Sequence, residues 1–116
     1  MNKICTSQEQ SKKLIELGID ISTADMLWTY DFMVNDINGL NVISELLQPE
    51  ENDIPAWSLS ALLKLIPKST ISTPNPFCDI YCCRNIEFNM EFYADNPVDA
   101  AFEMVVWLKE NNLKKK

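Results

Sequence analysis

The sequence contains no histidine among its 116 residues. Histidine is the side chain that most often serves as a general base near neutral pH, so its absence removes every Ser-His and Cys-His nucleophile pair. Carboxylate pairs remain, for example Glu87 with Glu91 or Asp95 with Asp99. The alternating pattern puts the first pair on the exposed face of a strand, and the second pair belongs to the start of a helix. We therefore expect no enzyme activity, no catalytic residues and no cofactor.

Glycine and long apolar runs are also scarce. Only two glycines occur, which argues against glycine-rich phosphate loops and against an all-β fold built of tight turns. No apolar run approaches the roughly 18 residues that a membrane-spanning helix needs. The start, MNKICTSQEQSKK, lacks the apolar core of a signal peptide. We expect a cytoplasmic protein without membrane association, in which the four cysteines stay reduced.

Cations are missing from one long stretch of the chain. Residues 14–63 contain no lysine or arginine, and the net charge of the whole chain is −7. Nine carboxylates lie in this stretch: Glu16, Asp20, Asp25, Asp31, Asp36, Glu45, Glu50, Glu51 and Asp53. Because nucleic-acid binding depends on cations that replace phosphate counterions, we expect no direct nucleic-acid contact. The cationic end, residues 113–116, is expected to be a short flexible tail.

What the sequence does contain is enough apolar material for a core. Hydrophobic residues make up 47% of the chain, and the length is that of one typical domain. We therefore expect residues 1–116 to form a single globular domain.

The first predicted helix lies in TSQEQSKKLIELGI. Either Thr6 with Glu9 or Ser7 with Gln10 can form a capping box at its start. Gly18 stands where a left-handed residue would end it.

A hairpin is predicted next. The segment DMLWTYDFMV is rich in aromatic and branched residues and predicts a strand. The stretch Asn35–Gly39, which ends in Asn38-Gly39, predicts the turn. The following LNVISELL fits the second strand, although Ile43, Leu46 and Leu47 also have helix spacing, so residues 40–47 can be either.

The middle of the chain alternates loops with one short helix. QPEENDIP and KSTISTPNPF are predicted loops because they are polar and proline-rich. Between them, Leu59, Leu62, Leu63 and Ile66 have helix spacing that ends at Pro67. CDIYCCRNIEFNMEFYA then predicts one long or two short strands, with an apolar face of alternating residues: Ile86, Phe88, Met90 and Phe92.

The last predicted helix, DNPVDAAFEMVVWLKENN, carries the widest apolar surface. Asp95 or Asn96 can cap it, and Pro97 suits its first position. Its apolar positions cover most of the circumference: Val98, Ala100, Ala101, Phe102, Met104, Val105, Val106, Trp107 and Leu108. Such a helix packs between a sheet and another helix, or its outer flank meets a second subunit.

Three cysteines cluster in CDIYCCRN. If this segment is a strand, Cys78 and Cys82 share one face and lie roughly 13 Å apart, while Cys83 faces the other way. That separation is too large for a disulfide or a shared metal. Unless Cys5 lies beside the cluster, we expect buried thiols and no metal site.

Three other side chains form the candidate interaction surface. Trp57 stands where a loop meets a helix, and Met104 and Trp107 lie on one flank of the last helix. Tryptophan and methionine are enriched at protein interfaces, although a place in the core is the alternative for each of them.

Three segments, TSQEQSKKLIELGIDISTADM, DIPAWSLSALLKLIP and DNPVDAAFEMVVWLKENN, resemble small uncharacterised proteins of prophages and mobile elements of gut bacteria. The resemblance implies a shared fold and carries no known activity. Residues 32–52 and 67–85 are less typical of the group.

Together these patterns predict an α+β fold in the order α-β-β-α-β-β-α, with a small antiparallel sheet and helices on one face. The function expected is a non-enzymatic protein-interaction or accessory module of a mobile element, which contacts another protein or forms a homodimer. One alternative is an acidic mimic of nucleic acid that inhibits a DNA-binding protein. Another is a small enzyme that uses carboxylates.

Overall fold

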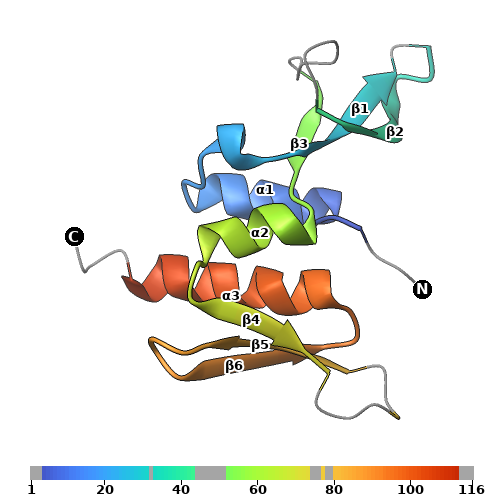
Figure 1. Cartoon of the computed structure of the whole chain (residues 1–116). Helices are drawn as coiled ribbons and strands as arrows, with labels where there is room; N and C mark the ends of the chain where they lie inside the picture. The colour runs from blue at the N-terminus through green and yellow to red at the C-terminus, as the bar shows by residue number, and fades with distance from the viewer. Residues whose placement is uncertain (1–3, 32, 44–51, 74–76, 78–79, 113–116) are drawn as a thin grey trace. The chain divides into compact units, whose positions relative to one another are not determined.

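The computed structural model describes residues 4–31, 33–43, 52–73, 77 and 80–112. The chain divides into two compact units, and each is treated by itself below. The first unit spans Cys5–Ser58, and the second comprises the residues from Leu59 onward together with the first few of the chain. Helices and small antiparallel sheets occur in both units (Figure 1), which confirms the α+β fold class. That residues 1–116 fold as one domain stays a prediction.

The first unit combines helices with a three-stranded antiparallel sheet. The strand order is β2-β1-β3, so β1 is central. Its elements are α1 (Gln8–Glu16), the short 3-10 helix η1 (Ile21–Thr23), β1 (Met26–Asp31), β2 (Asp36–Val42) and β3 (Ile54–Ala56).

Local signals set both ends of α1, as the sequence predicts. Ser7 and Gln10 form the capping box, because each side chain accepts a hydrogen bond from the backbone N–H of the other. At the other end Gly18 is left-handed, with φ of 88°. The N–H of Ile19 donates to the carbonyl of Leu14 and that of Gly18 to the carbonyl of Ile15, which is the Schellman pattern.

The β1–β2 hairpin is confirmed, but its turn lies earlier than the predicted stretch Asn35–Gly39 and overlaps that stretch only at its start. The chain reverses between Asp31 and Asp36, and Asn35 takes the left-handed conformation there, with φ of 60°. Gly39 lies inside β2, at an irregularity in the pairing between Trp28 and Tyr30 of β1. It has a φ of 152°, and a Cβ there would come within 3.0 Å of Thr29 Oγ1. The freedom of glycine therefore serves a β-bulge and not the turn. Residues 40–42 are strand, and 44–47 lie outside the described residues.

Strand β3 begins within the predicted loop QPEENDIP and ends one residue beyond it. It is three residues long and pairs with β1, with Pro55 opposite Leu27. A proline can stand there because an edge strand does not need every N–H for pairing.

The second unit contains two helices and another three-stranded antiparallel sheet. The strand order is β4-β5-β6, and consecutive strands pair. Its elements are α2 (Leu59–Leu65), β4 (Ser69–Ser72), β5 (Tyr81–Asn85), β6 (Met90–Ala94) and α3 (Pro97–Asn112).

Two of the predictions for this unit need correction, and three are confirmed. The predicted loop KSTISTPNPF, residues 68–77, contains β4, which pairs with β5. The alternation of Ile86 and Phe88 with polar residues is not strand, because residues 86–89 form a turn that ends at left-handed Asn89. The alternative of two short strands is therefore right. Helix α2 is confirmed, and α3 begins at Pro97 with the Asn96 side chain accepting from the N–H of Asp99 at 2.8 Å.

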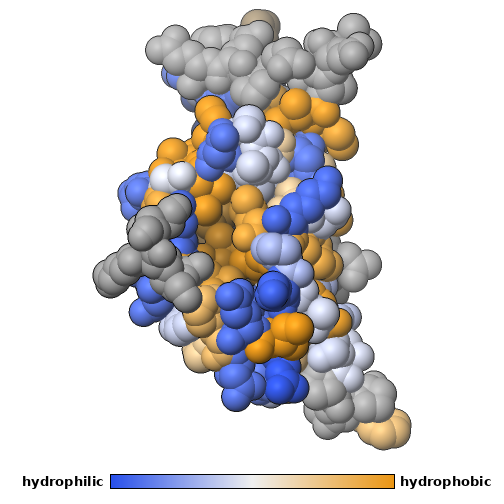
Figure 2. All heavy atoms as spheres, turned by 60° about the vertical axis from the view of Figure 1, so that its left-hand side comes forward, coloured by the Kyte–Doolittle hydropathy of each residue, from blue (hydrophilic) through white to orange (hydrophobic). Residues whose placement is uncertain are grey.

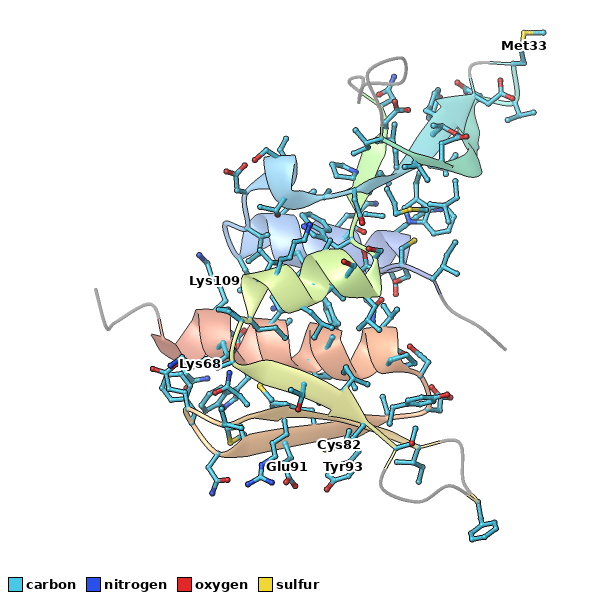
Figure 3. All side chains as sticks on the ribbon, viewed as in Figure 1. Met33, Lys68, Cys82, Glu91, Tyr93 and Lys109 are labelled. Carbon is cyan, nitrogen blue, oxygen red and sulfur yellow. The ribbon has the colours of Figure 1, made fainter. Side chains whose placement is uncertain are left out.

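Helix α3 covers one face of the β4-β5-β6 sheet (Figure 1) and contacts all three strands and α2. The opposite face is polar. Register places two rows of side chains there, namely Ser72, Cys82 and Tyr93, and Thr70, Arg84 and Glu91. Figure 3 shows Cys82, Glu91 and Tyr93 on the side of the sheet away from α3.

Candidate protein-contact site

The predicted interaction surface is mostly inside the molecule. Trp57 and Met104 have no exposed surface, and Trp107 is half-buried. The Trp107 ring meets the ring of Phe88 edge to face, with centroids 5.9 Å apart. Of the three residues, only Trp107 can touch a partner.

Trp57 anchors the core of the first unit. Its backbone N–H donates to Thr6 Oγ1 at 3.1 Å, and its carbonyl accepts from the N–H of Thr6 at 2.9 Å. The indole Nε1 donates to Thr23 Oγ1 at 2.8 Å. Thr6 Oγ1 also bonds buried Ser11 Oγ at 2.7 Å, so the polar groups around the ring are satisfied.

The apolar arc of α3 is covered largely within the chain. Five of its side chains are at most 2% exposed: Val98, Ala100, Ala101, Met104 and Val105. The rest are half-buried: Phe102, Val106, Trp107 and Leu108. This burial weakens the main argument for a homodimer, since the arc was its basis.

The cysteines that the structure describes, Cys5, Cys82 and Cys83, are buried thiols. Cys82 and Cys83 are successive residues of β5 and so face opposite sides of the sheet, while Cys5 lies in the first unit, where it bridges to Ser58. Burial raises the pKa of Cys83 to about 11, so this thiol stays protonated. Cys78 lies outside the described residues. Among the part of the chain described, no three Cys, Asp or Glu side chains gather as metal ligands would.

The structure places the two members of the first carboxylate pair in different elements, Glu87 in the turn of residues 86–89 and Glu91 in β6. Glu91 accepts the Tyr93 hydroxyl at 2.9 Å and lies 3.7 Å from Arg84 Nε. These contacts are exposed, and hydrogen bonds to Glu91 and then to Cys82 raise the pKa of Tyr93 to about 12. Asp95 and Asp99 both accept from the Asn96 side-chain amide, at 2.9 and 2.8 Å, which fixes the start of α3.

The carboxylates of the cation-free stretch act as backbone acceptors. Five aspartates each accept a hydrogen bond from a backbone N–H. Asp20 accepts from Ser22, Asp25 from Ser58, Asp31 from Met33, Asp36 from Ile37 and Asp53 from Tyr30. The Ser22 backbone bond also lowers the pKa of Asp20 below its usual value. Much of the acidity therefore stabilises turns and joins separate segments of the first unit.

Apolar side chains reach solvent at several points. Figure 2 shows them among hydrophilic ones on one face of the molecule. The large exposed ones are Ile4, Ile15, Ile21, Met33, Val34, Val42, Phe77, Ile80, Ile86 and Tyr93. Met33 and Val34 alone among them are adjacent in the sequence, at 93% and 56% exposed, and they form the tip of the β1–β2 hairpin. Figure 3 shows Met33 at the far end of that hairpin.

Hydrogen bonds on both sides of the tip hold its conformation. Asp31 Oδ1 accepts from the N–H of Met33 at 2.8 Å, and the Asp31 carbonyl accepts from the N–H of Asn35 at 2.7 Å. The Tyr30 hydroxyl donates to Asn35 Oδ1 at 2.6 Å. The tip therefore presents two apolar side chains on a turn that hydrogen bonds hold in place. The signal in the sequence is the apolar run Phe32-Met33-Val34 between Asp31 and Asn35-Asp36, and it was missed because the turn was predicted further along.

Comparisons with protein-family models, with curated proteins and with solved structures gave no match to this chain. Among the described residues, no helix combines the length and the apolar character needed to cross a membrane.

Proposed function

We propose that the protein is a non-enzymatic interaction module and that it binds a partner protein through the tip of the β1–β2 hairpin. The observation that carries this proposal is the near-complete exposure of Met33 beside exposed Val34, on a turn held by three hydrogen bonds. Exposed apolar side chains that adjoin each other on an ordered turn are typical of contact surfaces, since the free energy falls when a partner removes each of them from water.

A different protein fits this tip better than a second copy of the chain. In a two-fold contact between tips, Asp31 and Asp36 of one copy would meet the same residues of the other. Four carboxylates would then come together around the apolar contact, which opposes association. A homodimer through the tip is therefore disfavoured.

The nucleic-acid mimic has less support. A mimic needs carboxylates arrayed on one surface at phosphate-like spacing, whereas five of those in the cation-free stretch accept backbone hydrogen bonds at scattered turns and pairings. Their positions follow from folding needs. The resemblance to proteins of mobile elements supports an accessory role and does not specify a partner.

The test compares the wild-type chain with the double variant Met33→Ser, Val34→Ser and with the control Ile86→Ser. Ile86 is also exposed, at 68%, and lies in a turn of the other unit. Each chain is immobilised on a resin and incubated with a lysate of the organism that encodes it, and the proteins retained on the resin are quantified. We expect at least one protein to bind the wild type and the control and to lose roughly tenfold or more in affinity for the double variant. Equal retention by all three chains would contradict the proposal.

A further inference from the structure

Strand β6 forms one edge of the β4-β5-β6 sheet (Figure 1), and the hydrogen bonds show which of its backbone groups face outward. The N–H of Ile86, directly after β5, donates to the carbonyl of Lys68 on the β4 side. Because successive residues of a strand direct their backbone groups to opposite sides, the odd-numbered residues of β5 face β6 and bond its even-numbered residues. The N–H and C=O groups of Glu91 and Tyr93 therefore point away from β5.

The outer edge of β6 is open to a further strand. Among the described residues, no backbone hydrogen bond other than those with β5 involves β6. The other edges of the two described sheets carry features that hinder strand addition: the outward N–H of Ser69 in β4 is bonded to the carbonyl of Ile66, β3 contains Pro55, and β2 contains the bulge at Gly39. Strand β6 pairs regularly over its five residues and contains no proline, glycine or lysine.

The side chains of β6 indicate what an added strand would carry. Met90, Phe92 and Ala94 lie on the face that α3 covers, yet each is only half-buried. Apolar residues of an adjoining strand would remove more of their surface from water. On the outer face, Arg84 Nε of β5 lies 3.7 Å from Glu91 Oε2 of β6. A lysine or arginine in the next strand would continue this alternation of charge, since opposite charges stabilise cross-strand pairs.

We propose that the edge of β6 binds an extended segment of a partner protein, which adds to the sheet as a fourth strand. The segment has apolar residues at alternate positions and a lysine or arginine opposite Glu91. Main-chain bonds to Glu91 and Tyr93 supply affinity, and the side chains supply selectivity. This site lies in the second unit and does not depend on the hairpin tip, so it is a second contact surface.

A second copy of the chain fits this edge less well than a different protein. Each copy has a net charge of −7, and β6 contains no cation that could meet Glu91 of the other copy. The Tyr93 hydroxyl, which could face Glu91 of a second copy, already donates to Glu91 of its own chain at 2.9 Å.

The experiment selects peptides from a phage-displayed random library with the full wild-type chain as bait. The affinity of each selected peptide is then measured for the wild type, Tyr93→Pro and Tyr93→Thr. Proline removes the outward N–H and should leave the bonds to β5, whereas threonine keeps that N–H and removes only the phenol. Thermal unfolding checks that each variant is folded. A version of each peptide with alternate amides N-methylated tests the same hydrogen bonds without any change to the protein.

We expect the selected peptides to alternate apolar residues with polar ones that include lysine or arginine. They should bind Tyr93→Thr within about threefold of wild type and Tyr93→Pro at least about tenfold more weakly. N-methylation should cause a loss of similar size on the wild-type chain. Glu91→Gln, which keeps an acceptor for the Tyr93 hydroxyl, should weaken binding about threefold at low salt.

Three results would overturn this site. They are a selection that enriches no peptide, peptides that bind Tyr93→Pro or tolerate N-methylation as well as they bind wild type, and a wild-type dimer that becomes a single chain in Tyr93→Pro. The last would assign the edge to a second copy. Met33→Ser, Val34→Ser should bind the selected peptides like wild type, so failure of the β6 site leaves the hairpin proposal standing, and the reverse also holds.

Discussion

At the scale of single residues, buried tryptophan is a core anchor in this protein. Trp57 is fully buried and hydrogen-bonded through both its backbone and its indole. Trp57→Phe should lose the bond to Thr23 Oγ1 and some volume, for a cost of about 1–3 kcal/mol. Trp57→Ala should cost about 3–5 kcal/mol. Denaturant unfolding measures both, and a cost below that of a surface substitution would contradict the packing described.

Partner binding separates the core role of Trp57 from a contact role. Because its side chain is not exposed, folded Trp57→Phe should bind the partner as tightly as wild type. A large loss of affinity in this folded variant would show that Trp57 belongs to the interaction surface.

Tyr93 gives a prediction that depends on pH. Its hydroxyl donates to Glu91, and its pKa is raised from the ordinary value of 10.0 to about 12. A raised folded-state pKa means that the neutral phenol is favoured in the fold, so its contribution to stability is complete below pH 10 and is lost as pH rises through 12. In an alkaline titration followed by tyrosinate absorbance, Tyr93→Phe should remove a transition near pH 12. If the transition that this substitution removes lies near pH 10, the bond to Glu91 has little effect on the phenol.

At the scale of elements, the β-bulge of the hairpin depends on Gly39. Gly39→Ala should destabilise the first unit by on the order of 1–3 kcal/mol, because φ is 152° and the new Cβ would lie 3.0 Å from Thr29 Oγ1. Gly18→Ala is the matched comparison: its φ is 88°, but no atom lies within 4 Å of the added Cβ. Gly18→Ala should therefore cost only the conformational strain, about 1 kcal/mol.

The steric part of the Gly39 effect can be separated from the conformational part. The double variant Thr29→Ala, Gly39→Ala removes the crowding hydroxyl. Its loss of stability should therefore be smaller than the sum of the losses measured for the two single variants. Strict additivity would show that the close approach to Thr29 is unimportant.

The opposed carboxylates of the hairpin predict a gain in stability. Asp36→Asn should raise the free energy of unfolding by on the order of a few tenths of a kcal/mol, because it removes a like-charge pair and keeps the acceptor for Ile37. Thermal unfolding at low salt measures the change, and the gain should shrink as salt is added. Destabilisation by this substitution would mean that the charge of Asp36 supports the fold.

Elements with local start and stop signals were predictable from the sequence. The capping box of α1, its glycine ending and the proline start of α3 each involve residues within a few positions of each other. Strands β3 and β4 were missed because they are short, each lies in or beside a proline-containing segment, and each depends on a partner elsewhere in the chain, β1 and β5 respectively. The Asn-Gly rule misplaced the hairpin turn because a glycine can serve a bulge as readily as a turn.

The same limits apply to the site. Burial of Trp57 and Met104 comes from tertiary packing, which residue type alone does not show, since both types occur in cores and at interfaces. The exposed pair at the tip became visible only when the turn was located between Asp31 and Asp36.

At the scale of the whole molecule, the covered arc of α3 and the acidic hairpin tip both oppose self-association. Light scattering of the purified chain should give the mass of one chain, since neither surface favours a two-fold contact. A stable dimer that persists in Met33→Ser, Val34→Ser would show that another surface joins two copies.

Site-specific photo-crosslinking tests the central claim most directly. A photoactivatable amino acid replaces Met33 in one chain and Ile86 in another, and each chain is irradiated in the host lysate. The account predicts a discrete covalent adduct with one protein from position 33 and none from position 86. No adduct from position 33, or the same adducts from both positions, would contradict it.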